Sequence, residues 1–270
     1  MDDIRIRNAT RADTVELMTF WSRAGENGSR PEDRPELVDR LIDHDPQRLP
    51  EFLTWLDAVA EVSDVVNSPE TVRWNLDKQY LTELAEAGVP ITPTTFVTPG
   101  TPPQFPSGDF VVKPAVGAGS RDAASYGPDD HATAFEHVAR LHSAGQVVLI
   151  QPFVSSVAAE GEWPMVFFGG EFSHAASKRV QLPRAGSITD LFAAEVNAPH
   201  TASLAQVAVA QAAIDVVASR LGTPRYARVD LVRGDRQEYQ VLEVELIEPS
   251  LFLPQAGEEA AHRLARVLTG

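Results

Sequence analysis

Three carboxylates near the C-terminal end of the chain have the type and spacing of a site for a hard divalent cation. Asp230 lies in the run YARVDLV, and Glu243 and Glu245 lie in VLEVELIEPS. Alternate residues of a β-strand point to the same face, so Glu243 and Glu245 share one, and a turn near 234–237 brings Asp230 to that face from the partner strand. Mg²⁺ prefers such oxygen ligands and relieves their mutual repulsion. A hairpin that presents an acidic face to water fits the pattern equally well.

Five cationic side chains are placed where they could bind an anion, in a chain whose formal charge is −15. They are Lys78, Lys113, Lys178, Arg179 and Arg228. Three of them lie in or beside apolar strand-like runs, where a buried cation needs a partner. The phosphates of a nucleotide would supply that partner, with the metal carboxylates on the opposite side. Ion pairs with neighbouring Asp and Glu residues are the alternative, and for any single cation they are the more frequent case.

A glycine-rich loop follows Lys113 in the run FVVKPAVGAGS. It is not a P-loop, because no Gly-Lys-Ser/Thr follows, and it is not the dinucleotide fingerprint, because Asp122 stands where the third glycine belongs. Gly117 and Gly119 allow backbone N–H groups to approach an anion closely, and Ser120 adds a hydroxyl donor. An ordinary turn is the alternative interpretation of these glycines.

The apolar run VVLIQPFV is interrupted by Gln151 and Pro152. A proline inside a strand removes one donor from the hydrogen-bond ladder and frees neighbouring backbone groups. The pattern indicates either an edge strand or bulge, or a hinge whose backbone groups recognise an adenine edge.

The composition excludes several classes of function. A charge of −15 and a pI near 4.8 argue against nucleic acid or an anionic membrane as partner. The chain has no cysteine, so disulfides, thiolate metal sites and thiol nucleophiles are excluded, and it has no G-x-S-x-G nucleophile elbow. No apolar run reaches membrane-spanning length and the N-terminus has no signal-peptide pattern, which predicts a cytoplasmic protein.

The expected secondary structure is α+β. A single helix is predicted from the N-cap Ser68 to the stop at Gly88, and a long helix over about 203–221. Two hairpins are predicted, with a Gly-Gly turn at 169–170 and a second turn around 233–237. Helices alternate with largely antiparallel strands, which favours α+β over a parallel doubly wound sheet.

Together these motifs resemble the ATP-grasp superfamily, over about residue 50 to the C-terminus. The runs that carry the resemblance are RWNLDKQYL, FVVKPAVGAGS, QPFV, EGEWPMVFFGGEFSHAASKR, ARVDL and LEVELIEPSLFL. They are similar to the branch of small-molecule ligases related to glutathione synthetase and to the O-ureido-D-serine cyclo-ligase of cycloserine biosynthesis. The resemblance implies two α+β subdomains that grip a nucleotide. Within a core of 47–270, a lid subdomain would span about 90–155 and a metal-binding subdomain about 156–270.

The resemblance also implies a role for each candidate residue. ATP phosphates would be held by Lys78 and Lys113, under the loop of Gly117, Gly119 and Ser120. Adenine would be held by the hinge Gln151, Pro152, Phe153 and Val154, and Mg²⁺ or Mn²⁺ by Asp230, Glu243 and Glu245. Lys178 and Arg228 would be the catalytic contacts to phosphate or acyl phosphate. Such enzymes phosphorylate a carboxylate with ATP and let an amine attack the acyl phosphate. Positioning and charge neutralisation therefore supply most of the catalysis. The implied partner is a small amino-acid-like substrate, and a homodimer is a further expectation.

The first 46 residues depart from the family pattern. Members usually begin with a further α/β domain that ends in W-D-Y, and this pre-ATP-grasp domain is expected to be missing or truncated here, with Asp43-His44-Asp45-Pro46 at the join. IRIRNATRADTVELMTFWSRAG and PELVDRLIDHDP resemble the first strand and two helices of a GNAT acetyltransferase, whose acetyl-CoA loop the chain lacks. The expected function is a Mg-ATP-dependent carboxylate–amine or intramolecular cyclising ligase. The alternatives are a non-catalytic ATP-binding remnant and, less favoured, a GNAT-type acyltransferase.

Overall fold

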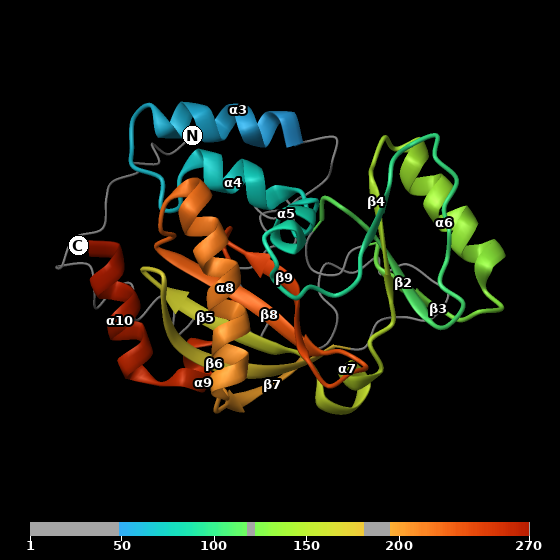
Figure 1. Cartoon of the computed structure of the whole chain (residues 1–270). Helices are drawn as coiled ribbons and strands as arrows, with labels where there is room; N and C mark the ends of the chain where they lie inside the picture. Colours follow the sequence, from blue (N-terminus) through green and yellow to red (C-terminus); the bar gives the residue numbers. More distant parts are fainter. Residues whose placement is uncertain (1–48, 118–121, 181–194, 270) are drawn as a thin grey trace, which may run out of the picture.

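The described part of the chain forms two α+β lobes that lie side by side (Figure 1). The structure is a computed structural model, and it describes residues 49–117, 122–180 and 195–269. The α+β prediction is confirmed, since each lobe combines an antiparallel sheet with helices. The predicted GNAT-like fragment 1–46 lies outside the described residues, as do Gly119 and Ser120.

The elements follow one another in alternation along the chain. The helices are α3 (Leu49–Ala60), α4 (Pro69–Leu76), α5 (Tyr80–Glu86), α6 (His131–Ser143), α7 (Ser155–Glu160), α8 (Leu204–Leu221), α9 (Leu253–Ala256) and α10 (Glu258–Thr269). The strands are β1 (Thr95–Val97), β2 (Phe110–Pro114), β3 (Ala124–Tyr126), β4 (Val148–Pro152), β5 (Trp163–Phe168), β6 (Glu171–Val180), β7 (Glu195–His200), β8 (Tyr226–Arg233) and β9 (Tyr239–Glu245).

The smaller lobe is a four-stranded antiparallel sheet in the order β1-β4-β2-β3, with α6 packed on it. Its core includes Phe110 and Val112 from β2, Ile150 from β4 and Leu141 from α6, all of them buried. Burial of such apolar side chains is the main stabilising contribution in a lobe of this size. The sheet thereby fixes β2, which ends at the glycine run, and β4, which leads to the QPFV segment.

The larger lobe is a five-stranded antiparallel sheet in the order β7-β6-β5-β8-β9. Its central strand β5 is buried along its whole length. Met165 and Phe167 belong to the core under α8, whereas Val166 and Phe168 belong to the core under α9 and α10. The continuous apolar sequence of β5 follows from this double coverage, because alternate residues enter opposite cores. Figure 1 shows α8 lying along one face of this sheet.

The helix expected over 68–88 is wrong as a single element, because the chain breaks at Asp77. Ser68 is the N-cap, and its side chain accepts a hydrogen bond from the Thr71 N–H at 3.2 Å. Asp77 takes an extended conformation and forms a β-bridge with Val116, and the Lys78 N–H donates to the Ala115 carbonyl at 2.9 Å. Pairing with the chain next to the glycine run therefore overrides the local helical preference, and it turns Lys78 toward that run.

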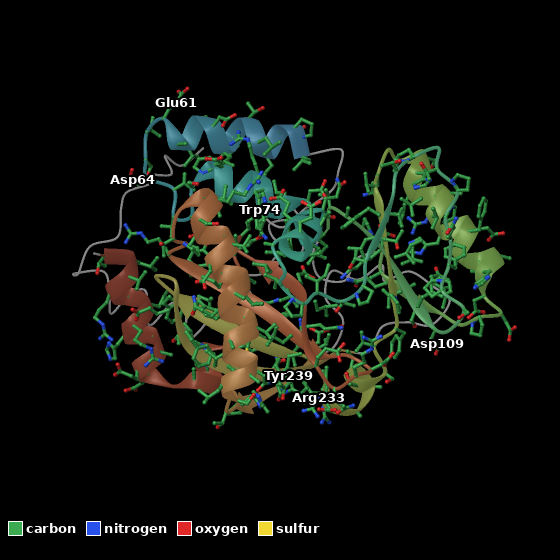
Figure 2. The ribbon with its side chains drawn as sticks, in the orientation of Figure 1. Glu61, Asp64, Trp74, Asp109, Arg233 and Tyr239 are labelled. Carbon is green, nitrogen blue, oxygen red and sulfur yellow. The ribbon has the colours of Figure 1, made fainter. Side chains whose placement is uncertain are left out.

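Both predicted hairpins are confirmed. The second one also holds α7, which connects the two lobes, through a hydrogen bond. β5 and β6 are joined through 169–170, and β8 and β9 through 234–238. At the end of the second hairpin, the Arg233 guanidinium lies over the Tyr239 ring at 5.4 Å and over the Trp163 ring at 5.7 Å (Figure 2). The Ser156 hydroxyl donates to the Arg233 carbonyl at 2.6 Å, so α7, which follows β4 of the smaller lobe, is fastened to the larger lobe.

Among the described residues, one helix, α8, is long and apolar enough to cross a membrane by length and composition alone. It packs on the five-stranded sheet through Ala210, Ala213, Ile214 and Val217, all of them buried. A capping box at its start, between Ser203 and Gln206, satisfies backbone groups that would otherwise lack partners. The helix is therefore packed as part of a protein core.

Candidate active site

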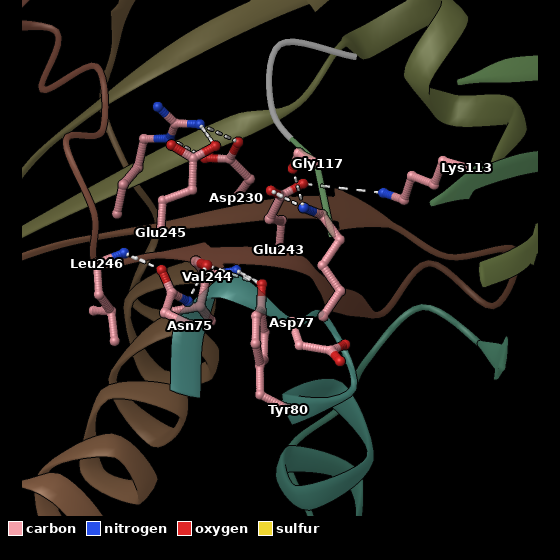
Figure 3. Close-up of polar contacts among 12 residues, drawn as sticks. Asn75, Asp77, Tyr80, Lys113, Gly117, Asp230, Glu243, Val244, Glu245 and Leu246 are labelled. Carbon is pink, nitrogen blue, oxygen red and sulfur yellow. Dashed lines mark hydrogen bonds and ion pairs between the residues drawn. The ribbon is translucent and has the colours of Figure 1, made fainter. Parts of the chain in front are cut away.

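The two lobes bring two lysines to one carboxylate on β9. Glu243 Oε1 lies 3.2 Å from Lys78 Nζ, and Glu243 Oε2 lies 4.0 Å from Lys113 Nζ (Figure 3). Lys113 is on β2 of the smaller lobe, and Lys78 lies at the break between α4 and α5. Lys78 Nζ also donates to the Gly117 carbonyl at 2.8 Å. Glu243 is therefore the point at which the smaller lobe, the broken helix and the larger sheet meet.

A third lysine lies between two carboxylates of the larger lobe. Lys178 Nζ on β6 is 3.0 Å from Asp230 Oδ2 on β8 and 2.7 Å from Glu162 Oε2. Glu162 stands just before β5, and its backbone pairs with that of Lys178 in both directions. Burial lowers the pKa of Lys178, but Asp230 and Glu162 outweigh it and raise that pKa above its ordinary value. The ammonium group is therefore kept charged inside the site.

Arg228 connects the remaining carboxylates to the C-terminal segment. Its Nε donates to Asp230 Oδ1 at 2.8 Å and its Nη2 to Asp230 Oδ2 at 3.1 Å. The same Nη2 pairs with Glu245, and Nη1 donates to the Ser250 carbonyl at 3.2 Å. The guanidinium also lies over the Phe252 ring, 5.7 Å from its centroid. Bidentate pairing fixes the geometry of this guanidinium closely.

The ionisable groups of the site are equal in number on the two sides. Four cations, Lys78, Lys113, Lys178 and Arg228, face four carboxylates, Glu162, Asp230, Glu243 and Glu245. Burial raises the pKa of Asp230, but Arg228 and Lys178 outweigh it and lower that pKa to about 2. Burial lowers the pKa of Lys113, and Lys78 adds to the effect by repulsion. Burial raises the pKa of Glu245 to about 7 although Arg228 opposes it, so the ion pairs do not hold every group of the cluster equally charged, and a ligand must exchange these pairs.

The predicted metal ligands lie on one face of the β8–β9 hairpin. Asp230 is the register partner of Glu243, and Arg228 is the register partner of Glu245. Within the described ranges, no group of three His, Cys, Asp or Glu side chains is already gathered as a metal site. The carboxylates are paired with cations instead. Their donor chemistry suits a hard divalent ion, because three carboxylates on neighbouring strands offer only oxygen ligands.

The remaining predicted site residues that the structure describes follow β2, or end or directly follow β4, in the smaller lobe. The Gly117 carbonyl accepts the hydrogen bond from Lys78. The edge-strand interpretation of the QPFV segment is wrong, because β4 lies between β1 and β2 in the sheet. Pro152 ends β4, which removes any conflict with the ladder. Gln151 is buried and donates to Thr94 Oγ1 at 2.9 Å, and the Phe153 N–H donates to the Asp109 carbonyl at 2.8 Å.

One of the five candidate cations points away from the cluster. Arg179 follows Lys178 on β6, and its Nη2 donates to the Ala159 carbonyl at 3.2 Å on the exposed side. The reason is the pleat, which turns successive side chains of a strand to opposite faces.

Three residues that contribute to the site were missed by the sequence analysis. Glu162 belongs to the charge cluster, and Asn75 and Tyr80 hydrogen-bond the backbone of β9 between and beyond the two glutamates. The available signal for Glu162 was an acidic residue directly before the apolar run WPMVFF, preceded by Gly161. Gly161 has φ +80°, and a Cβ there would lie 2.5 Å from the Lys178 carbonyl oxygen. Only glycine allows this close approach, which brings Glu162 beside Lys178.

The sequence is similar to that of one characterised protein. The chain is 38% identical over 235 residues to the cycloserine biosynthesis protein DcsG of Streptomyces lavendulae, a match that covers 82% of this chain and 78% of that protein. No family model matches the chain.

Solved structures share the fold. The crystal structure of D-cycloserine synthetase DcsG superposes with a TM-score of 0.74 at 32% identity, covering 96% of this chain and 95% of that one. D-alanine–D-alanine ligase from Bacillus anthracis superposes with a TM-score of 0.54 at 17% identity, covering 72% of this chain and 66% of that one. A RimK domain ATP-grasp protein from Sphaerobacter thermophilus gives a TM-score of 0.56 at 19% identity, covering 82% and 78%.

Proposed function

The chain belongs to the ATP-grasp ligases, enzymes that form C–N bonds, and from that premise we propose that it closes a ring within a small amino-acid-like substrate at the expense of ATP. One relative, DcsG, supports ring closure over the joining of separate molecules, both by its sequence and by its solved structure. The related sequence is named for cycloserine biosynthesis, and the structure that superposes at 32% identity is a D-cycloserine synthetase. A derivative of D-serine such as O-ureido-D-serine is the substrate we propose to test first.

The observation that carries the proposal is the meeting of Lys78 and Lys113 at Glu243. The two lysines come from different parts of the fold, and one of them belongs to the smaller lobe. Ammonium groups at these positions can hold the phosphates of ATP, which enter between the lobes. Gly117, beside Lys78, would begin the loop over the phosphates, and the segment 151–154 would hold adenine.

The carboxylates of the cluster are the groups we assign to the metal ion, opposite the cations assigned to the phosphates. Asp230, Glu243 and Glu245 would hold Mg²⁺, or Mn²⁺ in its place, and the ion would supply charge neutralisation at the phosphate oxygens. The cluster pairs four basic side chains with four carboxylates, so phosphate oxygens can take over the cations while the metal takes over the carboxylates, and neither set is left without a partner. Binding therefore exchanges the internal ion pairs for pairs with the ligand.

Lys178 and Arg228 are the residues we assign to the reacting carboxylate. Lys178 donates one hydrogen bond to Asp230 and Arg228 donates two, so their cationic heads are fixed before the substrate arrives. A fixed cation stabilises the charge that develops when the carboxylate is phosphorylated and when the amine displaces the phosphate. In the first step the carboxylate oxygen takes the γ-phosphoryl group of ATP and ADP leaves. In the second the amine attacks the acyl carbon, the C–N bond forms, inorganic phosphate leaves with the electron pair of the C–O bond, and the amine gives up one proton to the departing phosphate.

The proposed cellular setting is the cytoplasm, where ATP is supplied, and the proposed partner is the small substrate alone. A homodimer remains a prediction, which light scattering coupled to size exclusion would test.

Release of ADP tests the proposal. Purified protein with Mg-ATP is given O-ureido-D-serine, its L-enantiomer, or pairs of D-amino acids, and both ADP and product mass are measured. ADP release with a cyclic product from the D-serine derivative supports ring closure. ADP release with a joined product from two amino acids supports an intermolecular ligase instead. Mg-ATP binding without turnover on any substrate would indicate the non-catalytic remnant.

A further inference from the structure

The strand that carries Glu243 and Glu245 is the last strand of its sheet. In the order β7-β6-β5-β8-β9, β9 pairs with β8 along one edge only. The backbone groups of its other edge need partners, because buried N–H and C=O groups without hydrogen bonds are costly. The position of both glutamates therefore depends on what satisfies that outer edge.

Two buried side chains satisfy the edge between and just beyond the glutamates. The Tyr80 hydroxyl accepts a hydrogen bond from the Val244 N–H at 2.9 Å and donates to the Val244 carbonyl at 2.9 Å. Asn75 donates to the same carbonyl at 2.8 Å, and its amide oxygen accepts from the Leu246 N–H at 2.7 Å (Figure 3). Relative exposure is 2% for Tyr80 and 9% for Asn75. Side chains thus stand in for a neighbouring strand at this part of β9.

Farther along the same edge, ordinary backbone bonds replace the side chains. The Val241 N–H donates to the Pro90 carbonyl at 2.8 Å, and the Thr92 N–H donates to the Val241 carbonyl at 2.9 Å. The change from backbone to side-chain partners coincides with the residues that carry the two carboxylates.

The segment that supplies these side chains also supplies a phosphate-site lysine. Asn75 lies in the last turn of α4, Tyr80 begins α5, and Lys78 lies between them with its ammonium 3.2 Å from Glu243. One short stretch of chain therefore sets both the backbone of the carboxylate strand and the cation opposite it. Groups that orient metal ligands in this way are known to affect metal affinity strongly.

We propose that Tyr80 and Asn75 are positioning residues that hold the Glu243–Glu245 stretch of β9 in the geometry required for the metal ion. This inference rests on the proposed function, since it concerns the carboxylates assigned to the metal. It assigns no contact between Tyr80 or Asn75 and the substrate. Their action is through the backbone of Val244 and Leu246.

The test compares metal affinity with nucleotide affinity in three variants. Tyr80→Phe removes only the hydroxyl, and Asn75→Leu replaces the amide by an apolar group of similar size. Tyr126→Phe is the matched control, because Tyr126 is also buried and hydrogen-bonded, to His137 at 2.8 Å, but lies in the smaller lobe. Calorimetry gives the Mg²⁺ concentration for half-saturation at fixed AMP-PNP, and the AMP-PNP affinity at saturating Mg²⁺.

Positioning predicts a split between the two affinities. The Mg²⁺ concentration for half-saturation should rise about tenfold or more in Tyr80→Phe and in Asn75→Leu. The AMP-PNP affinity at saturating Mg²⁺ should stay within about twofold, and Tyr126→Phe should change neither quantity. Folded variants with unchanged Mg²⁺ dependence would overturn the inference. If one variant fails to fold, the other still decides.

The failure of the proposed function gives a different result. Wild-type protein that binds no Mg-AMP-PNP would reject the nucleotide site itself, whereas wild-type binding with insensitive variants would reject only the positioning role.

Discussion

The Lys178 ammonium on β6 and the Asp230 carboxylate on β8 form an ion pair at 3.0 Å, although the whole of β5 separates their strands in the sheet. Asp230 is also held by both nitrogens of Arg228 that face it. The carboxylate thus connects two cations that come from different strands. Asp230 is therefore the centre of the charge cluster, and replacement of either cation should disturb it.

Replacement of Lys178 should reduce turnover more than the loss of one surface charge. Lys178→Met leaves Glu162 and Asp230 without the cation between them, so we expect the free energy of unfolding to fall by about 3 kcal/mol. ADP release should fall about 100-fold, as for loss of one fixed group that stabilises developing charge. The matched control is Arg179→Met, which removes the next cation along β6 on the exposed face. Equal effects of the two variants would contradict the assignment.

A methyl group at Gly161 should disturb the site as well as the backbone. Gly161→Ala places a Cβ 2.5 Å from the Lys178 carbonyl oxygen, whereas Gly222→Ala meets nothing within 4 Å although its φ is also positive, at +84°. Both changes carry the strain of a positive φ, and Gly161→Ala should cost about 2 kcal/mol more because of the contact. Urea unfolding measures both costs. ATP affinity should fall in Gly161→Ala alone, and similar costs with unchanged affinity would show that the close approach is unimportant.

The smaller lobe should lose stability as the pH falls below neutrality. Burial, and then repulsion by Arg140, lower the pKa of His137 from 6.5 to about 4, against the opposing effect of Asp122. A histidine whose pKa is lower in the folded state contributes stability fully above pH 6.5 and loses it as the pH falls toward 4. The Tyr126 hydroxyl lies 2.8 Å from Nδ1, and burial disfavours the charged ring, so the folded state favours neutral His137.

Thermal unfolding across that pH window tests the role of His137. His137→Gln should melt with a weaker dependence on pH than the native chain. The control His262→Gln, at an exposed position on α10, should leave the dependence unchanged. An identical pH dependence in all three proteins would mean that His137 does not titrate differently on folding.

The sequence allowed prediction of the parts of the site that depend on local periodicity. The two-residue repeat of a strand and the turn residues near 234–237 were enough to place Asp230 on the face of Glu243, and the structure makes the two residues register partners. The same reasoning failed for Arg179, which the pleat turns away. Local rules also identified the N-cap Ser68 and the Gly-Gly turn at 169–170.

The parts that escaped prediction depend on contacts between distant segments. The break at Asp77 arises from its bridge to Val116, and no local signal in the helical run announces it. Glu162 enters the cluster because its backbone pairs with that of Lys178, sixteen residues later. In the sequence, Tyr80 and Asn75 have the pattern of ordinary helical residues, and their role follows only from their hydrogen bonds to the outer edge of β9. Such tertiary pairings override local propensity and become visible only in the fold.

The most direct test of the account is thermal unfolding with Mg²⁺ alone, ATP alone, and both together. The native chain is compared with the double variant Asp230→Asn plus Glu243→Gln. Because the cluster is internally paired, either ligand alone should stabilise the native chain little. Both together, at about 100 times the dissociation constant, should stabilise it by about 2.7 kcal/mol, and the double variant should lose that effect. An unchanged melting temperature of the native chain at millimolar Mg-ATP would contradict the assignment of the paired lysines and carboxylates to a metal–nucleotide site.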